Sequence, residues 1–374
     1  MLFLTYNDSP SGIYFSQVTD VCHFLNVRLN AKIKLVALIS VRNFWENRRK
    51  IKSQISSSLI IPMIPGIGNW KFNFYLLWLL FVFIDSKKII ARGPFAASLA
   101  LRLRKSGMVK FVCFDARGAS VAETDEYNVW SDKKNIKTIF ETEKNAIINS
   151  DYRMAVSNSL VNYWIQEFGY KENKHVTIPC TLNSNYFKKL PAENFIKTKR
   201  SQFGFSENDT ILVFSGSLAG WQSFQLIDDF LFEQMKQNSS IKIFLLLKKF
   251  PSNMKIAIEF SNRISCKWFN EHEVPDILSI CDYGLLLREK SITNKVASPV
   301  KFAEYLASGL KIIISDGVGD YSAFVRKHEC GFILNQMNLN LIPLSYSEKL
   351  KNSLLAFQYL SKESLKEKYQ RIIE

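Results

Sequence analysis

Short runs of apolar residues recur along the chain and alternate with amphipathic segments. Such runs are typical of strands that are buried on both faces of a parallel sheet. Strands are predicted at residues 2–6, 33–40, 89–91, 110–114, 152–157, 210–215, 241–247, 283–287 and 310–315, and residues 174–179 are expected to close the first domain. Helices are predicted at residues 13–29, 95–105, 138–150, 160–168, 274–280, 299–308 and 348–374. This alternation predicts an α/β fold with doubly wound sheets.

The length of the chain and one change in its composition predict two domains. At 374 residues, the chain is too long for a single core and long enough for two. Residues 180–208 lack a long apolar period and are rich in Asn, Lys, Ser and Pro, which is typical of a connection. We therefore expect the first domain to be residues 1–179 and the second to begin at residue 180.

Residues 72–84 form a long apolar run, FNFYLLWLLFVFI. A helix of this length is about 20 Å long, which is short of the roughly 30 Å hydrocarbon core of a bilayer. We therefore do not expect it to span a membrane. The first choice is a helix buried in its domain, and the alternative is an interfacial helix with Trp70 and Trp78 near the headgroups.

Cysteine usage and the first residues indicate a cytosolic protein. The six cysteines are scattered without a CxxC spacing, which favours reduced core residues over a disulfide frame or a zinc site. Residues 1–6 are apolar, but they lack a basic segment and run directly into the turn-like sequence NDSPSG. A secretory signal is therefore not expected.

Basic charge is concentrated in the first part of the chain. Residues 1–110 hold 16 Lys and Arg against 4 Asp and Glu, whereas the net charge of the whole chain is +15. Such a surface suits an anionic membrane, an acidic lipid diphosphate or nucleic acid. Nucleic acid is disfavoured, because the sequence has no recognisable binding motif and no regular interleaving of aromatics with arginines.

One stretch, residues 281–316, carries the sharpest pattern in the chain. A buried strand at 283–287 is followed by a loop, and then Ser298 stands at the expected N-cap with Pro299 at the first helical position. Gly309 is expected to end the helix, and the next buried strand follows at 310–315. The stretch therefore predicts a βαβ unit.

Two charged residues distinguish the outer face of that helix. Lys301 lies in the first turn, where a cation opposes the helix dipole unless an anion is bound there. Glu304, one turn later, has two acceptor oxygens that suit a pair of sugar hydroxyls. The alternative is a solvated Lys301–Glu304 pair that contributes only a few tenths of a kcal/mol.

The segment SPVKFAEYLASGLKIIIS, residues 298–315, resembles the donor-binding signature of family 4 retaining glycosyltransferases of bacterial surface-polysaccharide type. The resemblance implies the GT-B fold, in which two Rossmann-like doubly wound domains face a central cleft. It implies that Glu304 binds the nucleotide ribose, and that Lys301 and the backbone at Ser298 and Pro299 hold the diphosphate. It also implies a second domain at 180–355 and a C-terminal helix, 356–374, that packs back on the first domain.

Polar residues follow the predicted strands of the first domain, at the edge where open α/β sheets bind ligands. Gly12 is the nearest match to a glycine-containing loop that the family places beside the donor phosphates, and its alternative is an ordinary turn glycine. Asp115, Arg117 and Glu123 follow the strand at 110–114, where the family often has a histidine. We expect Asp115 or Glu123 to contact the sugars; the alternative is an Asp115–Arg117 ion pair that holds the loop.

The second domain departs from the family pattern in two places. Gly216 and Ser217 follow the strand at 210–215, where small residues let backbone N–H groups approach phosphate, but the basic residues usual in this loop are missing. We expect Arg288 to supply that charge. The first glutamate of the family's acidic pair is replaced by Val296, so Glu289 is the candidate for the missing carboxylate.

The resemblance and these residues predict a glycosyltransferase that transfers a sugar from a nucleotide diphosphate sugar with retention of anomeric configuration. A lipid-linked saccharide at the cytoplasmic face of the inner membrane is the expected acceptor. Because no DxD motif is present, neither a metal nor another cofactor is expected. Two rivals stay open: a nucleotide-sugar epimerase of the same fold, and a non-catalytic basic module that binds membrane or nucleic acid.

Overall fold

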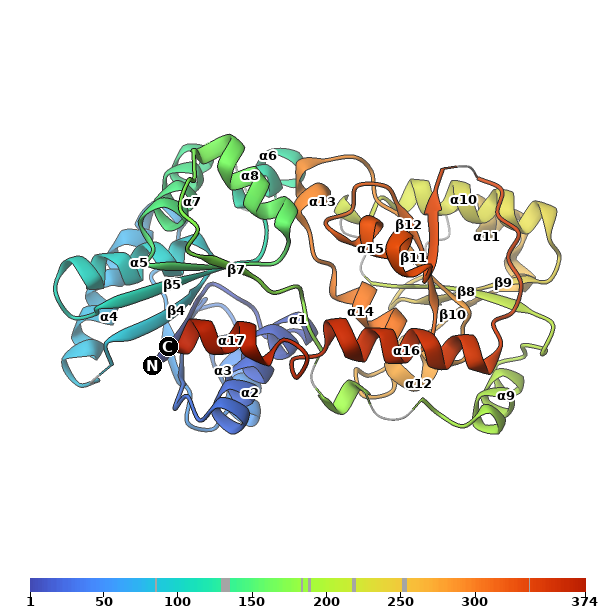
Figure 1. Ribbon diagram of the computed structural model, residues 1–374, viewed down its shortest axis with the longest axis horizontal. Coiled ribbons are helices and arrows are strands. Elements are labelled where there is room, and N and C mark those ends of the chain that lie inside the picture. The colour runs from blue at the N-terminus through green and yellow to red at the C-terminus, as the bar shows by residue number, and fades with distance from the viewer. Residues whose placement is uncertain are drawn as a thin grey trace. The chain divides into compact units, whose positions relative to one another are not determined.

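The computed structural model describes residues 1–84, 86–128, 135–182, 184–187, 190–216, 220–250, 254–335 and 337–374. Within this part of the chain, contacts define two compact units (Figure 1). The first unit combines Met1–Asn183 with Leu365–Glu374, and the second is Ser184–Ser364. Each unit contains a parallel sheet, which confirms the expected α/β fold with two Rossmann-like domains.

The sheet of the first unit has seven strands in the order β3-β2-β1-β4-β5-β6-β7. The strands are β1 (Leu2–Tyr6), β2 (Lys34–Ile39), β3 (Leu59–Pro62), β4 (Lys88–Arg92), β5 (Phe111–Ala116), β6 (Tyr152–Ala155) and β7 (His175–Thr177). The strand order reverses between β1 and β4, where Leu4 pairs with Ala91. This reversal is a topological switch point, the usual ligand-binding place of an open α/β sheet.

Helices cover both faces of this sheet. They are α1 (Gly12–Tyr14), the π-helical turn η1 (Phe15–Thr19), α2 (Asp20–Leu29), α3 (Phe44–Gln54), η2 (Ile67–Phe72), α4 (Asn73–Val82), α5 (Gly93–Lys105), α6 (Ser120–Tyr127), α7 (Ile136–Asn149), α8 (Asn158–Phe168) and α17 (Lys366–Ile373). In Figure 1, α5, α7 and α8 lie on one face, and α2, α3 and α17 lie on the other.

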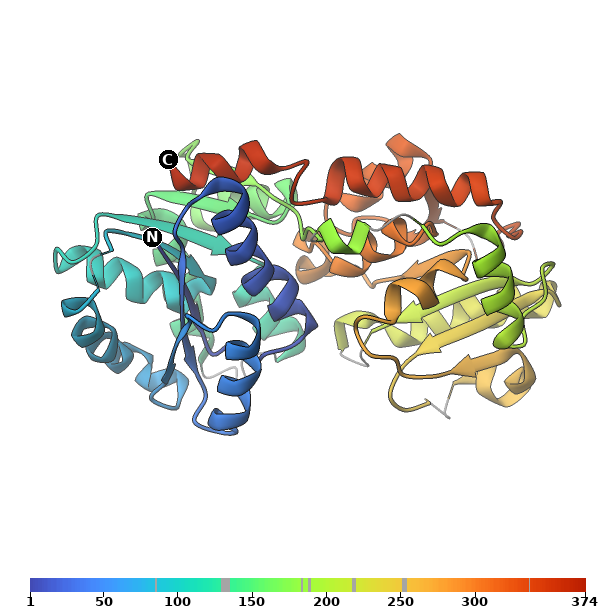
Figure 2. The ribbon, with the colours of Figure 1, turned by 90° about the horizontal axis from the view of Figure 1, so that it is seen from below.

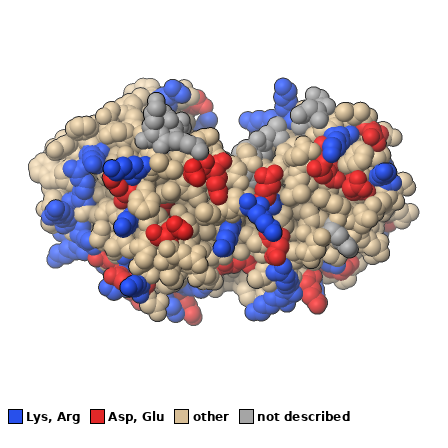
Figure 3. Space-filling model, turned by 90° about the horizontal axis from the view of Figure 1, so that it is seen from above, with Lys and Arg blue, Asp and Glu red and all other residues tan. Residues whose placement is uncertain are grey.

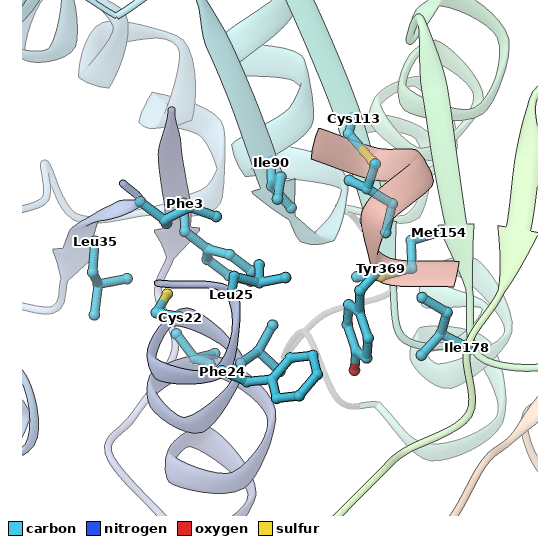
Figure 4. Packing of buried hydrophobic residues seen from close by; sticks show 14 of the residues in the cluster. Phe3, Cys22, Phe24, Leu25, Leu35, Ile90, Cys113, Met154, Ile178 and Tyr369 are labelled. Carbon is cyan, nitrogen blue, oxygen red and sulfur yellow. The ribbon is translucent and has the colours of Figure 1, made fainter. Parts of the chain in front are cut away.

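The late helix α17 completes the core of the first unit (Figure 4). Tyr369 and Ile372 are buried in the same cluster as Phe24, whose ring centroid lies 5.5 Å from that of Tyr369. The Tyr369 hydroxyl is 3.1 Å from the Thr181 hydroxyl, and the Lys88 ammonium donates to the carbonyl of Ile373 at 2.9 Å. Residues 365–374 are therefore part of the first unit.

The sheet of the second unit has six strands in the order β10-β9-β8-β11-β12-β13, with its reversal between β8 and β11. The strands are β8 (Thr210–Ser215), β9 (Ile241–Leu246), β10 (Ile264–Cys266), β11 (Tyr283–Leu286), β12 (Lys311–Ser315) and β13 (Gly331–Leu334). The helical segments are η4 (Ser184–Phe187), α9 (Glu193–Gln202), η5 (Gly220–Gln222), α10 (Phe224–Gln237), α11 (Lys255–Glu259), η6 (Ser261–Arg263), α12 (Val274–Ser279), α13 (Ile292–Val296), α14 (Val300–Ala307), α15 (Tyr321–His328) and α16 (Tyr346–Leu360). Helices α10 and α11 lie on one face of the sheet, and α12, α14 and α16 on the other (Figures 1 and 2).

A buried charge cluster joins three elements of the second unit. Asp282 is fully buried at the start of β11 and accepts a hydrogen bond from the backbone N–H of Ile211 at 2.8 Å. The guanidinium of Arg200 on α9 lies 3.3 Å from its carboxylate, and the ammonium of Lys349 on α16 lies 3.7 Å away. The cluster ties α9 and α16 to the sheet at the edge opposite the carboxyl ends of its strands.

Several elements have weak sequence signals and are not predicted. Helix α9 lies inside residues 180–208, which were expected to be a connection. It was not predicted because only two of its ten residues, Ile196 and Arg200, are buried, and its apolar period is therefore weak. Strands β3 and β13 lie at sheet edges and have no fully buried residue. The helices that the sequence predicts at residues 348–374 are α16 and α17, which the segment 361–365 separates.

Helix α4 corrects the first choice for residues 72–84. Asn73, Leu77 and Phe81 are buried, but Trp78 on another side of the helix is 42% exposed, so the helix is buried on one face only. No helix in the described part of the chain combines the length and the hydropathy that crossing a membrane requires.

Candidate active site

The candidate donor site lies at the switch point of the second unit. Strands β8 and β11 are neighbours there, with Gly284 paired to Val213, and their carboxyl ends lead into Gly216 and Arg288. Helix α14, which holds Lys301 and Glu304, packs against β11 and β12. The topology therefore brings four of the residues that the sequence predicts for the site, Gly216, Arg288, Lys301 and Glu304, to one end of this sheet, although they lie up to 88 positions apart.

Helix α14 begins one residue later than predicted. Pro299 is the N-cap, with ψ of 125°, and Val300 is the first helical residue. Ser298 therefore precedes the N-cap, and its hydroxyl lies 2.9 Å from the Tyr321 hydroxyl. The described structure shows no side-chain cap at this end, which suits a helix start that binds an anion.

The outer face of α14 contains the predicted charged pair. The Lys301 ammonium lies 2.6 Å from Oε2 of Glu304, and the two side chains are 30% and 16% exposed. The ion pair that the sequence allowed as the alternative is therefore formed in this structure. Tyr186 of η4 lies close by: burial raises its pKa well above the usual value, and the nearby charge of Glu304 raises it further.

A buried contact fixes α14 to the sheet. The ring of Tyr305 lies directly on Gly284 of β11, where an added Cβ would come within 2.3 Å of the ring. Its phenol oxygen accepts a hydrogen bond from the backbone N–H of Ser215, at the end of β8, at 2.9 Å. This contact sets the position of the preceding residue of the helix, Glu304, relative to the switch point.

Arg288 lies in the same place. It directly follows Leu287 beyond β11, is 7% exposed, and its backbone N–H donates to the Ser315 hydroxyl at 2.9 Å. Burial raises the pKa of Tyr305, and the nearby guanidinium of Arg288 acts in the opposite direction. The structure therefore places a buried cation beside the β8–β11 switch point, as expected for a residue that replaces the missing basic loop.

The loop after β8 is described only in part. A Cβ at Gly216 would lie 3.4 Å from the Phe214 ring and 3.5 Å from the Gln222 amide nitrogen, so Gly216 packs closely beneath Gln222. Ser217, the other predicted residue of this loop, lies outside the described residues.

Glu289 lies in the loop between β11 and α13 with its side chain exposed. Its backbone N–H donates to the Ser223 hydroxyl at 2.7 Å, and its carbonyl accepts from the Asn294 amide at 3.1 Å. Val296, at the position of the family's first glutamate, is buried. The backbone of Glu289 is therefore fixed while its carboxylate faces solvent.

A second candidate site lies at the switch point of the first unit. A cavity of about 160 Å³ opens beside the ends of β1, β4 and β5. Its lining residues are Tyr6, Asp8, Arg92, Gly93, Pro94, Phe95, Ala96, Phe114, Arg117, Gly118, Ser120 and Glu123. Gly12, the exposed first residue of α1, is not among them; Ser11 caps this helix by accepting from the Tyr14 N–H at 3.3 Å.

Asp115 lies beneath this cavity and does not line it. Its carboxylate is fully buried, with Arg117 at 2.7 Å and Arg92 at 3.6 Å. The ion pair with Arg117 that the sequence allowed as an alternative is therefore present, and Arg92 is a second partner that sequence reasoning missed. Both guanidinium groups line the cavity above Asp115, and Arg92 also lies 3.4 Å from Asp8.

Glu123 does line the cavity. Its carboxylate lies over Gly118, where an added Cβ would come within 2.2 Å of Oε1. Burial, assisted by the charge of Glu126, raises the pKa of Glu123 to about 7. Both protonation states of this carboxyl group are therefore populated near neutral pH, in a cavity that Arg92 and Arg117 also line.

Glu143 of α7 supports the segment that carries Glu123, and sequence reasoning missed it. It is buried and accepts hydrogen bonds from the backbone N–H groups of Ser120 and Val121 at 3.0 and 2.8 Å, at the start of α6. Burial nevertheless raises its pKa to about 8. The available signal was a carboxylate at an inward position of α7, four residues after the buried Ile139.

Comparison with known proteins shows the fold. The sequence matches no protein-family profile and no curated protein. The structure of Anabaena HepE in complex with UDP is similar over 99% of this chain and 98% of that one, with a TM-score of 0.71 and 12% identity. WaaG, a glycosyltransferase involved in lipopolysaccharide biosynthesis, matches with a TM-score of 0.63 and 9% identity, over 100% and 94% of the two chains.

Epimerases of nucleotide sugars share this fold as well. The UDP-GlcNAc 2-epimerase of Neisseria meningitidis, bound to UDP-GlcNAc, has a TM-score of 0.54 and 12% identity over 100% of this chain and 94% of that one. The chain thus has the GT-B type of fold, with two Rossmann-like domains.

Proposed function

We propose that this protein is a glycosyltransferase that uses a nucleotide diphosphate sugar as donor. The observation that carries the proposal is the arrangement at the β8–β11 switch point, where the buried Arg288 follows β11 and the start of α14 carries Lys301 and Glu304. Two cations and a helix start suit a diphosphate, and a carboxylate one turn along the helix suits the ribose hydroxyls. Similarity to HepE with bound UDP and to WaaG supports this choice.

The Lys301–Glu304 pair has a defined part in donor binding. At 2.6 Å the two groups neutralise each other in the free protein. A bound diphosphate attracts the Lys301 ammonium, and Glu304 then becomes available to accept hydrogen bonds from the ribose. Exchange of this kind keeps both charges partnered in the free and bound states, which lowers the desolvation cost of binding.

Transfer requires that negative charge on the departing diphosphate be stabilised. The backbone of Arg288 is fixed by its hydrogen bond to the Ser315 hydroxyl and its side chain is buried, so we propose that its charge is preorganised at the switch point. The backbone N–H groups at the start of α14 add their dipoles. We propose that these groups, together with Lys301, stabilise the leaving group and that no metal ion or other cofactor is required.

The acceptor is proposed to bind in the cavity of the first unit. Arg92 and Arg117 offer cationic donors there, and Glu123 offers a carboxyl group whose pKa of about 7 suits proton exchange with a sugar hydroxyl. Asp115 is proposed as a positioning residue that holds both arginines. Gly12 and Glu289 are kept as proposed donor contacts, on the family resemblance alone.

Three finer points of the proposal rest on the resemblance of residues 298–315. They are retention of anomeric configuration, a lipid-linked saccharide as acceptor, and a place in the synthesis of bacterial surface polysaccharide such as O-antigen or capsule. A lipid-linked acceptor implies peripheral association with the cytoplasmic face of an anionic membrane. The basic character of residues 1–110 supports such an association.

The test is nucleoside diphosphate binding by the full chain. We expect one diphosphate from a panel of uridine, guanosine and adenosine diphosphates to raise the melting temperature in a saturable way. Glu304→Gln is expected to weaken that binding by roughly tenfold or more, which corresponds to the loss of a charge-assisted hydrogen bond. Glu348→Gln is the matched control. Glu348 lies on α16, outside the candidate site, and pairs with Lys311 of β12 at 2.7 Å, so this variant also removes one carboxylate from an ion pair. No binding by any diphosphate, or equal losses in both variants, would contradict the proposal.

Nucleotide-sugar epimerisation is the second candidate, because the fold is shared with the epimerase bound to UDP-GlcNAc. An epimerase converts a nucleotide sugar without any acceptor. Incubation with UDP-GlcNAc alone, followed by chromatographic separation of epimers, distinguishes the two functions. Appearance of an epimer in the absence of acceptor would favour this second candidate.

A further inference from the structure

Helix α4 leaves a continuous apolar surface uncovered on the first unit. Six large apolar side chains on and beside the helix are between 42% and 80% exposed, namely Phe72, Tyr75, Trp78, Leu79, Val82 and Phe83. At about 100° per residue these positions fall on one side of a helix. Asn73, Leu77 and Phe81 fall on the other side and are buried in the unit. We call the six exposed residues the α4 surface.

The side of a surface helix that faces water normally carries polar residues, whereas the α4 surface is formed by large apolar and aromatic side chains. From Phe74 to Ile84 the sequence contains no charged or amide side chain. A helix that is apolar all round is normally covered on all sides by protein or lipid. The described protein covers only one side of α4, so the exposed side requires a further apolar partner.

Basic groups lie at both ends of this surface. Lys71 directly precedes it, and the Arg102 guanidinium lies 4.7 Å from the Phe74 ring centroid and donates to the Lys71 carbonyl at 3.0 Å. Lys87 is exposed shortly after the helix. Over residues 67–110 the sequence has eight Lys and Arg but a single acid, Asp85. Figure 3 shows Lys and Arg gathered toward the left edge of the first unit, the side on which α4 lies in Figure 1.

We propose that the α4 surface docks on an anionic lipid bilayer, with α4 in the plane of the interface. An apolar strip flanked by cations complements acyl chains bordered by anionic headgroups. Trp78 and Tyr75 are the residue types that favour the membrane–water boundary. The helix has ten residues and is about 15 Å long, so it lies in one leaflet and does not span. Contact with a second copy is disfavoured, because two-fold symmetry would bring the two sets of cations together.

This inference rests on the proposed function and deepens it, because an enzyme with an acceptor in the membrane needs a surface that contacts the membrane. Its test is independent of that function, because docking on vesicles requires neither nucleotide nor turnover. Loss of vesicle binding and loss of nucleotide binding are therefore separate results.

The experiment is co-sedimentation of the full chain with vesicles of phosphatidylglycerol mixed with phosphatidylcholine, and with vesicles of phosphatidylcholine alone. We expect binding to the anionic vesicles that weakens as salt rises. The variant with Trp78→Ser, Leu79→Ser and Phe83→Ser is expected to bind at least about tenfold more weakly, because three side chains no longer enter the acyl region. Lys71→Ala and Lys87→Ala are each expected to weaken binding about fivefold, which corresponds to about 1 kcal/mol per lysine.

The matched control is Trp45→Ser. Trp45 is 73% exposed on α3 of the same unit and has the Arg48 guanidinium 5.8 Å from its ring, so it tests a second basic and aromatic surface. Because all substituted side chains are exposed, circular dichroism and melting temperature should stay unchanged. Full vesicle binding by the triple variant, or its loss in Trp45→Ser alone, would overturn the proposal. A wild-type dimer that becomes a monomer in the triple variant, without vesicle binding, would assign the α4 surface to a second copy instead.

Discussion

The phenol oxygen of Tyr305 accepts a hydrogen bond from the backbone N–H of Ser215 at 2.9 Å, and this contact ties α14 to the carboxyl end of β8. Tyr305 is completely buried, and its ring rests on Gly284. The neighbouring residue, Glu304, is thereby set at the switch point. A buried side chain that makes no predicted ligand contact thus determines the geometry of the candidate donor site.

Tyr305→Phe is expected to lower the free energy of unfolding by about 1–3 kcal/mol, because it leaves the buried N–H of Ser215 without its acceptor. Urea unfolding measures this change. Nucleotide binding should weaken at the same time, since α14 loses its anchor. An unchanged unfolding curve would show that the hydrogen bond contributes little.

Lys301→Ala is expected to reduce kcat/KM for transfer by roughly a hundredfold or more, the usual effect of removing one group that stabilises a developing anion. Stability should change by less than about 1 kcal/mol, because the Lys301–Glu304 pair is partly exposed. Initial rates and thermal unfolding measure the two effects. Lys311→Ala removes a comparable pair, with Glu348 at 2.7 Å, outside the site and should leave kcat/KM unchanged.

Glu123 should make stability depend on pH. Its pKa is raised from 4.5 to about 7, so the folded protein binds this proton more tightly than the unfolded chain does. The resulting stabilisation is fully present below about pH 4.5 and is lost as the pH rises through 7. Glu123→Gln should remove this part of the pH dependence in urea unfolding. Glu126→Gln should move the transition to lower pH, since the charge of Glu126 raises the pKa of Glu123; an identical profile in all three proteins would contradict the assignment.

Asp282→Asn is expected to destabilise the second unit by roughly 3–5 kcal/mol, because Arg200 and Lys349 would remain buried without their common counter-charge. Thermal or urea unfolding measures the loss. Glu193→Gln is the control: Glu193 pairs with Lys197 at 3.4 Å on the surface of α9, so its loss should cost less than about 1 kcal/mol.

The sequence predicted the order of strands and helices well, because parallel strands are continuous apolar runs that differ clearly from what surrounds them. It also predicted the helix that carries the candidate donor residues, since a proline, a lysine and a glutamate mark the start of α14. The N-cap was misplaced by one residue because Ser298 and Pro299 both fit helix starts, and only the extended ψ of Pro299 separates them.

Contacts between residues far apart in the chain could not be predicted from the sequence. Nothing in the local pattern of Gly284 indicates that a tyrosine 21 residues later will lie on it. Likewise, Arg92 and Asp115 approach within 3.6 Å only because β4 and β5 are neighbours. For α4 the first choice was wrong for the opposite reason: its sequence is so apolar that complete burial was favoured, and only the alternative of an interfacial helix allowed an exposed face.

The contribution of α17 to the first unit has a consequence for biosynthesis. Tyr369 and Ile372 fill the core that Phe24 and its neighbours begin, yet the ribosome makes the entire second unit in between. The nascent first domain therefore emerges with a gap in its interior and waits for a late segment to close it. During that interval its apolar surface is open to chaperones and to misassembly.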